Sequence, residues 1–250
     1  MGIQTFLIVC PLVFLAGFVD AIAGGGGLIS LPAYMFAGVP VHNAIATNKL
    51  SSATGTAVST WHLVKSKCVD ICLVPGTVAC AFVGSIAGAN LALIISDKVL
   101  KTVLVFVLPV VAFCVLRDKD LKPVIPEGFT RKKQYLIMAA CSFVIGIYDG
   151  FYGPGTGTFL LLAFTKLGKH DIDKASGNVK VVNLTSNISA LITFILAGKI
   201  LWVLGLSASV FSIAGHYLGA HMVVKNGVKI IKPIILLVLA LLLIKIVLGI

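Results

Sequence analysis

Long apolar runs with few or no charged residues occupy most of the chain. A helix that crosses the hydrocarbon core of a bilayer needs about 20 consecutive apolar residues, and several of the runs approach this length. The pattern therefore predicts an all-α, polytopic membrane protein rather than a single anchor. The expected segments are residues 3–19, 28–37, 44–64, 71–95 and 100–116, followed by 135–148, 156–167, 175–197, 200–224 and 230–250.

Composition supports a protein that lies within lipid. Hydrophobic residues make up 58% of the 250 residues and charged residues only 12%, whereas soluble domains carry about a quarter charged residues. The first run lacks the basic flank and the small-residue cleavage site of a secretory signal, so we expect it to be retained. The net charge of +11 fits loop Lys and Arg beside anionic lipid headgroups. We expect membrane lipid as a partner and no nucleic acid.

Two stretches of the chain resemble each other and predict two homologous halves. Residues 17–26, Gly-Phe-Val-Asp-Ala-Ile-Ala-Gly-Gly-Gly, align with residues 146–155, Gly-Ile-Tyr-Asp-Gly-Phe-Tyr-Gly-Pro-Gly. Further on, Lys49 and Lys180 fall in matching positions if the second connecting loop is two residues longer. We predict a first transmembrane repeat over residues 1–117, a cytoplasmic linker over 118–133 and a second transmembrane repeat over 134–250.

The number of crossings in each half determines how the halves are related. Five crossings per half give an inverted repeat. Most loop Lys and Arg then fall on the side of the linker, with only Lys98, Lys101 and Lys199 on the other. Because positive loops are cytoplasmic, this bias places the linker in the cytoplasm. The alternative is that the short second segments, 28–37 and 156–167, re-enter instead of crossing, which gives four spans per half and a parallel repeat.

Glycine-rich runs break the helical pattern at matching positions of the two halves. Neither run can continue a helix at low cost, and non-helical backbone at membrane depth must face protein or a water-filled cavity. A helix that begins near Leu28 or Thr158 would direct backbone N–H groups and a positive dipole end into that cavity, where they favour an anion. Tight helix packing is the alternative explanation. The breaks supply the predicted substrate-binding residues Gly24, Gly25, Gly26, Gly27, Gly153, Gly155, Thr156 and Gly157.

Two lysines lie close to or within the apolar cores of the third and eighth segments. An ammonium group inside a bilayer needs a partner or a wet cavity, and two positive charges at one cavity favour an anionic substrate. The alternative for Lys49 and Lys180 is that they extend to the interface. Polar side chains nearby can donate hydrogen bonds to oxyanions. The predicted substrate-binding set therefore also includes Asn48, Lys49, Ser52, Lys180, Asn183 and Asn187.

Asp20 and Asp149 precede the two breaks. They could neutralise the lysines, hold the broken backbone by capping, or take up a proton during transport. His216 and His221 are five residues apart and share no helix face, so they are a poor metal pair and we interpret them as interior or interfacial histidines. The cysteines show no metal-binding spacing, and we expect neither a metal nor a cofactor.

These residues resemble the sulfite exporter TauE/SafE family, also called the TSUP family of membrane transporters. The resemblance rests on the run from Gly17 to Pro32, on Ala46-Thr47-Asn48-Lys49, and on their counterparts Gly146–Gly157 and Lys180–Asn187. The first run departs from the commoner family pattern because it has four glycines and no polar residue before Ser30. The resemblance implies transport of a small sulfur-containing anion, such as sulfite or a sulfonate, across a cell inner membrane.

The sequence thus predicts a secondary transporter of small anions and not an enzyme. A passive anion channel is the alternative, since charged rings and helix ends also build selective pores. An intramembrane aspartyl protease needs paired carboxylates, but no Gly-x-Gly-Asp motif accompanies Asp20 or Asp149. Proton coupling and assembly into a homo-oligomer are further hypotheses.

Overall fold

The computed structural model describes residues 2–100, 102, 126 and 128–226. Every regular element within these residues is helical. The elements are α1 (Ile3–Ala23), α2 (Gly27–Phe36), α3 (Val41–Lys65), a 3₁₀ turn η1 (Ile71–Leu73), α4 (Val74–Ile94), α6 (Arg131–Phe151), α7 (Thr156–Leu162), a π-helical turn η2 (Ala163–Leu167), α8 (Ile172–Leu196) and α9 (Trp202–Asn226). The predicted segments 100–116 and 230–250 and most of the linker 118–133 lie outside the described residues, so the division into repeats stays a prediction.

Five of the described helices are long and apolar enough to cross a membrane, which confirms an all-α polytopic protein. They cover Ile3–Ile22, Ile71–Ile94, Arg131–Phe151, Ile172–Leu196 and Trp202–Lys225. Helix α3 has 25 residues and hence a length of about 37 Å, but its many Ser, Thr and Asn residues and its lysine make it more polar than these five. It lies against α8 and α9 in the interior, so its polar residues face protein.

The outer surface of the helices is apolar and the polar residues are inside. Large apolar side chains on several helices are more than half exposed, including Ile3, Leu136, Val144, Leu196 and Val203. Such a surface is unusual for a soluble monomer and suits contact with lipid. Lys49, Asp149 and Lys180 are each only 2% exposed. This distribution agrees with the membrane location that the composition predicts.

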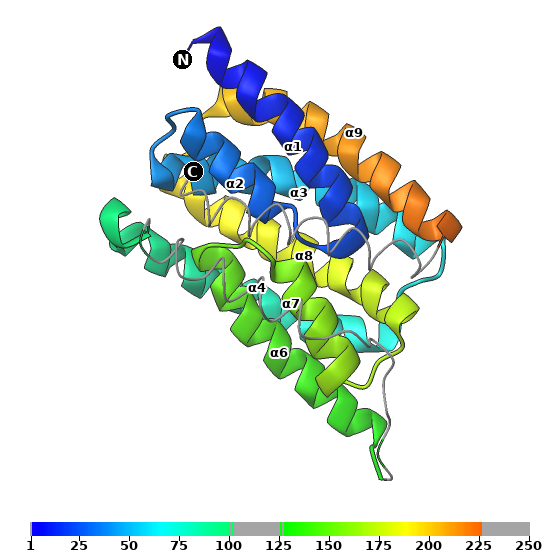
Figure 1. Cartoon of the computed structure of the whole chain (residues 1–250). Helices are drawn as coiled ribbons and strands as arrows, with labels where there is room; N and C mark the ends of the chain where they lie inside the picture. The colour runs from blue at the N-terminus through cyan, green and yellow to red at the C-terminus, as the bar shows by residue number, and fades with distance from the viewer. Residues whose placement is uncertain (1, 101, 103–125, 127, 227–250) are drawn as a thin grey trace.

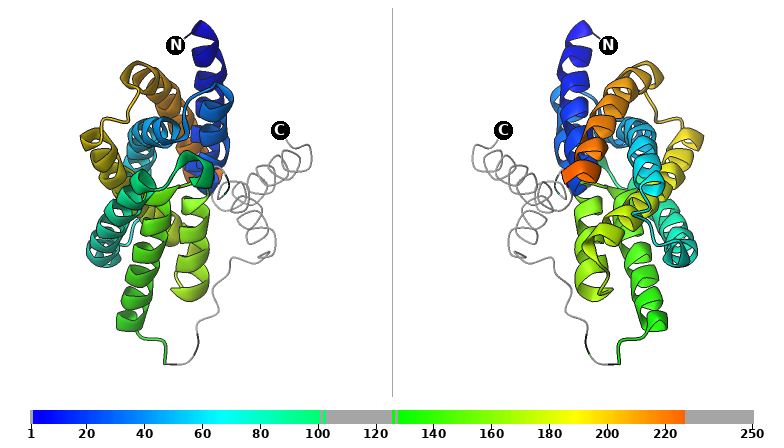
Figure 2. Two further views of the ribbon diagram at one scale, coloured as in Figure 1. Left: turned by 90° about the vertical axis from the view of Figure 1, so that its left-hand side faces the viewer. Right: turned by 90° about the vertical axis from the view of Figure 1, so that its right-hand side faces the viewer.

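The helices form a layered bundle in which helices from the first part of the chain pack against helices from the second. Helix α1 packs against α9 and α4 packs against α6, while α3 and α8 lie together between these pairs (Figures 1 and 2). Each of these contacts joins a helix from the first part of the chain to one from the second. Residues that match between the halves are therefore brought together at the centre.

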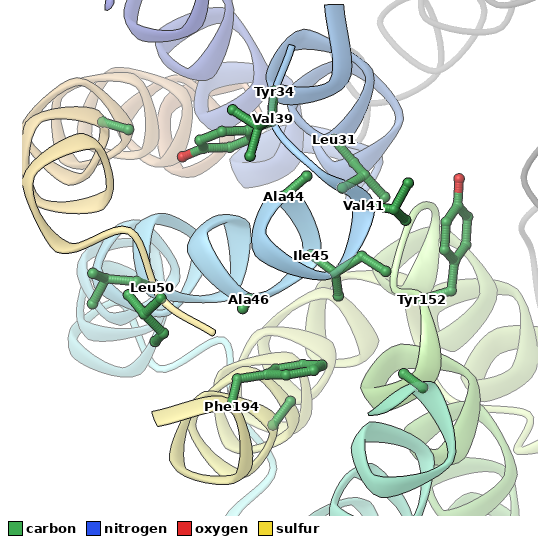
Figure 3. Packing of buried hydrophobic residues seen from close by; sticks show 14 of the residues in the cluster. Leu31, Tyr34, Val39, Val41, Ala44, Ile45, Ala46, Leu50, Tyr152 and Phe194 are labelled. Carbon is green, nitrogen blue, oxygen red and sulfur yellow. The ribbon is translucent and has the colours of Figure 1, made fainter. Parts of the chain in front are cut away.

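The apolar core beside this centre fixes the position of α2. Leu31 and Tyr34 of α2 are fully buried, as are Ile45 of α3 and Phe194 of α8 (Figure 3). Tyr34 also shares a hydrogen bond with Ser51 across 3.1 Å. Together with its packing against α1, these contacts attach the short helix to α3, so the backbone just before it, at the first glycine break, is held in one place.

The helix ends differ from those predicted. Helix α1 continues past Val19 to Ala23, where Gly24 ends it in the left-handed conformation with φ of 77°, because the sequence between Asp20 and the glycines is still apolar. Helix α6 begins at Arg131, where the Thr130 side chain accepts a hydrogen bond from the Lys133 N–H. The last residues assigned to the linker are therefore helical.

These shifts change the positions of the charged residues. Asp20 and Asp149 lie within the last turns of α1 and α6 rather than at their ends. Helices α3 and α8 begin earlier than predicted, at Val41 and Ile172. Lys49 and Lys180 consequently lie about two turns inside their helices, away from the loops.

The length of the short helices bears on the topology. Helix α2, with 10 residues, extends over about 15 Å, and α7 with its π-helical turn over about 18 Å. The hydrocarbon core is about 30 Å thick. Length therefore favours re-entry of these segments over a crossing. The inverted orientation of the two halves stays a prediction.

Candidate functional site

The two glycine breaks meet in the middle of the protein. The Thr158 N–H donates a hydrogen bond to the Gly24 carbonyl oxygen across 3.1 Å. A Cβ atom added to Gly24 would lie 2.6 Å from the Gly157 Cα, and one added to Gly27 would lie 2.9 Å from the Pro154 Cα. Side chains at these glycines would hold the two backbones apart. The glycines thus allow the ends of α1 and α6 and the starts of α2 and α7 to converge.

A small cavity of about 30 Å³ lies at this meeting point. All the predicted site residues line it except Gly25 and Lys180, and Lys180 is bonded to the lining residue Asp20. Further lining residues come from α1, α2, α3 and α9: Val13, Ala16, Gly17, Ser30, Ser51, Thr56, Ser212 and His216. A cavity holds a water molecule once it exceeds about 10–15 Å³, so this one has room for a water or two.

One side of the cavity holds a buried ion pair between α3 and α6. Lys49 Nζ lies 2.7 Å from Asp149 Oδ2 and donates a hydrogen bond to Asn187 Oδ1 across 3.0 Å. Asp149 also accepts hydrogen bonds from Ser186 Oγ (2.5 Å) and Thr156 Oγ1 (2.8 Å). Both charged side chains are 3% exposed. The alternative in which Lys49 extends to the interface is therefore wrong.

The other side holds a second ion pair, between α8 and α1. Lys180 Nζ lies 3.0 Å from Asp20 Oδ2 and also donates to the Asp20 carbonyl oxygen. Asp20 Oδ1 accepts a hydrogen bond from the Gly26 N–H (3.1 Å), and Oδ2 lies 3.3 Å from His216 Nε2. The Lys180 side chain is 3% exposed and that of Asp20 is 14% exposed. Lys180 is thus also buried rather than at an interface.

The two pairs are reciprocal, since the lysine of each predicted half is bonded to the aspartate of the other. Two of the three roles considered for the aspartates are present: both neutralise a lysine, and Asp20 holds the broken backbone at Gly26. The sequence positions of the lysines suggest an uncompensated positive charge at the cavity. The ion pairs show instead that both lysines are neutralised. Mutual pairing offsets the large cost of removing such charges from water.

The backbone N–H groups at the breaks are partly engaged. Helix α2 begins at Gly27 and α7 at Thr156, as the glycine runs predict. However, the N–H of Gly26 bonds to Asp20, that of Leu28 to the Gly25 carbonyl oxygen, and that of Thr158 to Gly24. Only part of the predicted donor set is therefore available to a ligand.

Two polar atoms of α3 that lie at the cavity have no bond within the described part of the chain. Asn48 Oδ1 and Thr56 Oγ1 are both buried and lack a hydrogen-bond partner there, and both residues line the cavity. Buried polar groups without a partner are rare in native structures and call for a ligand or a water. These atoms indicate that the cavity is built for polar contents.

Sequence reasoning missed the contribution of α9. The interpretation of His216 as an interior histidine is confirmed, since it is only 2% exposed. The sequence does not indicate, however, that it lies against Asp20 at the cavity, with Ser212 one turn before it. A Cβ atom on Gly17 would lie 2.7 Å from His216 Nδ1, and one on Gly55 would also overlap the ring. The imidazole thus occupies a slot that two glycines leave open. The only signal in the sequence is a histidine inside an apolar segment that also contains His221.

Fold and site together define a polytopic membrane protein with a polar cavity at broken helices deep in its interior, an arrangement known from secondary transporters. The model of the family described as "Sulfite exporter TauE/SafE" matches residues 9–246. The chain belongs to this family of membrane transporters.

Curated relatives cover most of the chain. The protein is 38% identical over 231 residues to "Probable membrane transporter protein YfcA" of Escherichia coli (strain K12), an alignment that covers 90% of this chain and 83% of the relative. It is 34% identical over 238 residues to "Probable membrane transporter protein" of Haemophilus influenzae, covering 95% and 92% of the two chains. A third relative, "Probable membrane transporter protein ORF9" of Sinorhizobium sp, is 34% identical over 225 residues, covering 90% and 85%. No solved structure matches the chain.

Proposed function

We propose that this protein is a secondary transporter that carries a small sulfur-containing anion, such as sulfite or a sulfonate, across the cell inner membrane. The family description names sulfite, and the cavity offers Lys49, Asn183 and Asn187 as side chains that donate hydrogen bonds to an oxyanion. The same cavity has unpartnered acceptor capacity at Asn48 and Thr56 for water or for a protonated group of the ligand.

The reciprocal ion pairs are the observation that carries this proposal. An anion that enters the cavity competes with Asp149 for Lys49, because the lysine is the strongest donor that lines the cavity. The two pairs together are neutral, so an anion bound alone would add an uncompensated charge in a low-dielectric interior. A proton that binds with the anion restores neutrality. The proposal therefore includes coupling of one proton to each negative charge carried.

The small volume of the cavity assigns the described structure to a closed state. A cavity of about 30 Å³ holds little more than a water molecule, whereas sulfite has four heavy atoms. The helices around the glycine contact must separate to admit the anion. Alternating access in other transporters works by such movement of one repeat against the other around a fixed site.

Uptake by reconstituted protein tests this function. Vesicles that contain the wild type should take up sulfite, or a sulfonate such as methanesulfonate, with saturation and with acceleration by unlabelled anion on the opposite side. Saturable counterflow identifies a carrier. Conductance that rises linearly with concentration, without counterflow, would instead identify the passive anion channel.

A variant that keeps the cavity neutral tests the site. In the double variant Lys49→Met with Asp149→Asn, no charge is left unpaired, so the protein should fold, but the main cation for the anion is lost. Because hydrogen bonds to charged groups contribute about 1.5–3 kcal/mol, uptake should fall by about tenfold or more. Lys65→Met is the matched control, since Lys65 is exposed on the same helix. Normal uptake by the double variant would place the anion site elsewhere.

A further inference from the structure

His216 lies in contact with Asp20, and its bonds within α9 indicate which ring nitrogen carries a hydrogen. The ring atom Nδ1 lies 2.9 Å from the Ser212 carbonyl oxygen. A carbonyl oxygen accepts hydrogen bonds and has no hydrogen to donate, so Nδ1 carries the hydrogen of this bond. In the opposite arrangement Ser212 Oγ would donate to Nδ1 across 3.4 Å, and the Nδ1 lone pair would face the carbonyl oxygen at the shorter distance. The network therefore assigns the hydrogen to Nδ1.

This assignment leaves the other ring nitrogen without a hydrogen in a neutral histidine. Yet His216 Nε2 lies 3.3 Å from Asp20 Oδ2, which is also bonded to Lys180. Two lone pairs facing each other would repel. The contact is favourable only if one further proton is present between them, either on Nε2 or on the carboxyl group. This position is therefore suited to take up one further proton when the anion binds.

Within the described residues, the other ion pair has no second site for a proton beside its carboxylate. Asp149 is surrounded by Lys49, Ser186 and Thr156, and all three donate to an ionised carboxylate. Among the described residues, no imidazole contacts Asp149. The Asp149 side chain is 3% exposed, whereas that of Asp20 is 14% exposed, so Asp20 is also easier to reach from the cavity.

We infer that His216 and Asp20 together form the binding site for the proton that accompanies the anion; this inference rests on the transport function proposed above. With this proton bound, the Lys180, Asp20 and His216 cluster carries one net positive charge, and the cavity can accept one negative charge. Once the proton leaves, the cluster is neutral and the anion is held more weakly, by Lys49 and the amide donors of the cavity. His216 and Asp20 thus have a role in coupling, separate from the binding role of Lys49.

Several other titratable groups surround His216 within the described residues. Lys180 of α8 shares Asp20 with it, and the Lys49 and Asp149 pair of α3 and α6 lines the same cavity. His62 of α3 packs against the Tyr217 ring, next to His216 on α9, with ring centroids 5.1 Å apart. Lys180 disfavours the extra proton and Asp20 favours it. The carboxylate is bonded to the imidazole, while Lys180 reaches it through Asp20.

The variant His216→Gln tests the inference, because glutamine keeps a hydrogen-bonding amide but takes up no proton. His221→Gln is the matched control, since His221 is exposed on the same helix. Proteins with matched melting temperatures are reconstituted in vesicles that enclose a pH-sensitive dye, and anion uptake and internal acidification are followed together. Methanesulfonate is the probe if the wild type carries it, because it stays ionised. Otherwise sulfite is used, with protein-free vesicles as the blank.

We expect acidification to accompany anion uptake in the wild type and in His221→Gln. In His216→Gln, anion counterflow should continue with a higher half-saturating concentration, while the acidification per anion taken up falls at least tenfold. An unchanged ratio of protons to anions in His216→Gln would overturn the inference. Anion exchange without acidification in the wild type would also overturn it and leave the transport function standing, whereas absence of any exchange in the wild type would refute the transport function itself.

If His216→Gln transports no anion, a binding experiment tests the inference instead. Calorimetric titration of the purified protein with the same anion, in buffers of different ionisation enthalpy, counts the protons taken up per anion bound. Binding without proton uptake by the variant, against one proton in the wild type, supports the inference. Unchanged proton uptake overturns it, and so does complete loss of binding, because His216 would then be a direct ligand of the anion.

Discussion

The Lys49–Asp149 and Lys180–Asp20 pairs occupy matching positions in the predicted halves, but their surroundings differ. Asp149 is enclosed by the donors Lys49, Ser186 and Thr156, and its backbone break is held through the Thr156 side chain. Asp20 holds its break directly at the Gly26 N–H and faces an imidazole. The two pairs thus suit different roles. The Lys49–Asp149 pair holds a fixed charge, whereas the Lys180–Asp20 pair, next to the imidazole, can gain and lose a proton.

The contact between the breaks should be the most sensitive point, because it holds both pairs in place. Gly24→Ala combines a left-handed backbone, with φ of 77°, with overlap against the Gly157 and Thr158 backbone. We expect loss of folded protein, measured by the yield of monodisperse protein after purification. Gly38→Ala is the matched control: its φ is 79° but its surroundings are open, so it should cost only about 1–2 kcal/mol. Equal effects would mean that the contact is unimportant.

Removing one cation at a time should separate the two pairs. Lys49→Met leaves Asp149 buried without its cation, a change that costs about 3–5 kcal/mol for buried pairs. Lys180→Met should cost less, because Asp20 keeps its bond to Gly26, the contact with His216 and its partial exposure. Denaturation of the purified variants in detergent measures the difference. A larger loss in Lys180→Met would reverse the comparison.

Two serines, one beside each ion pair, offer a smaller test of how the surroundings of the pairs differ. Ser186→Ala removes the short hydrogen bond to the Asp149 carboxylate and should lower stability by about 1.5–3 kcal/mol. Ser212→Ala removes only a 3.4 Å contact with His216 and leaves the bond from the ring to the Ser212 carbonyl oxygen. Its effect should be below about 1 kcal/mol. Melting temperatures of the two variants provide the comparison, and similar losses would contradict it.

The effect of one histidine outside the membrane-spanning helices on the pH dependence of stability must be distinguished from the pH dependence of the site. His170, before α8, is buried, and its burial lowers the pKa of the imidazole, with nearby Arg131 and Lys174 acting in the same direction. The unfolded chain then binds a proton near pH 6.5 that the folded chain does not bind until lower pH. Stability should therefore fall as the pH drops below this value.

The variant His170→Asn should show a smaller loss of melting temperature between neutral pH and about pH 5.5 than the wild type. This is the smallest of the expected effects, because a single proton is involved. His42→Asn serves as a comparison, because His42, in the first turn of α3, is paired with Asp97. An unchanged pH profile in His170→Asn would show that other groups dominate acid destabilisation.

Much of the fold and the site follows from local sequence features. The apolar runs gave the described helices, and the glycine breaks located the cavity, because unpaired backbone is tolerated inside a membrane protein only in such places. Lys49 and Lys180 were recognisable because an ammonium group in an apolar segment needs a partner. The matching order of Asp, Gly and Lys in the two halves indicated that these features belong together.

The remaining features depend on contacts between distant helices. The sequence offered both aspartates as partners but did not indicate that Lys49 bonds to Asp149 and Lys180 to Asp20, since that depends on how α3, α6, α8 and α1 pack. His216 was missed because its place at the cavity depends on Gly17 and Gly55, two glycines from other helices that nothing in the sequence links to α9.

Reciprocal pairing between the halves is the central claim, and a thermodynamic double-mutant cycle tests it most directly. The cycle compares the free energies of unfolding of Lys49→Met, Asp149→Asn and the double variant, beside the same cycle for Lys49→Met and Asp20→Asn. We predict a coupling energy of about 0.5–3 kcal/mol for Lys49 with Asp149 and a clearly smaller one for Lys49 with Asp20. Additive effects in the first cycle, or stronger coupling in the second, would contradict the account.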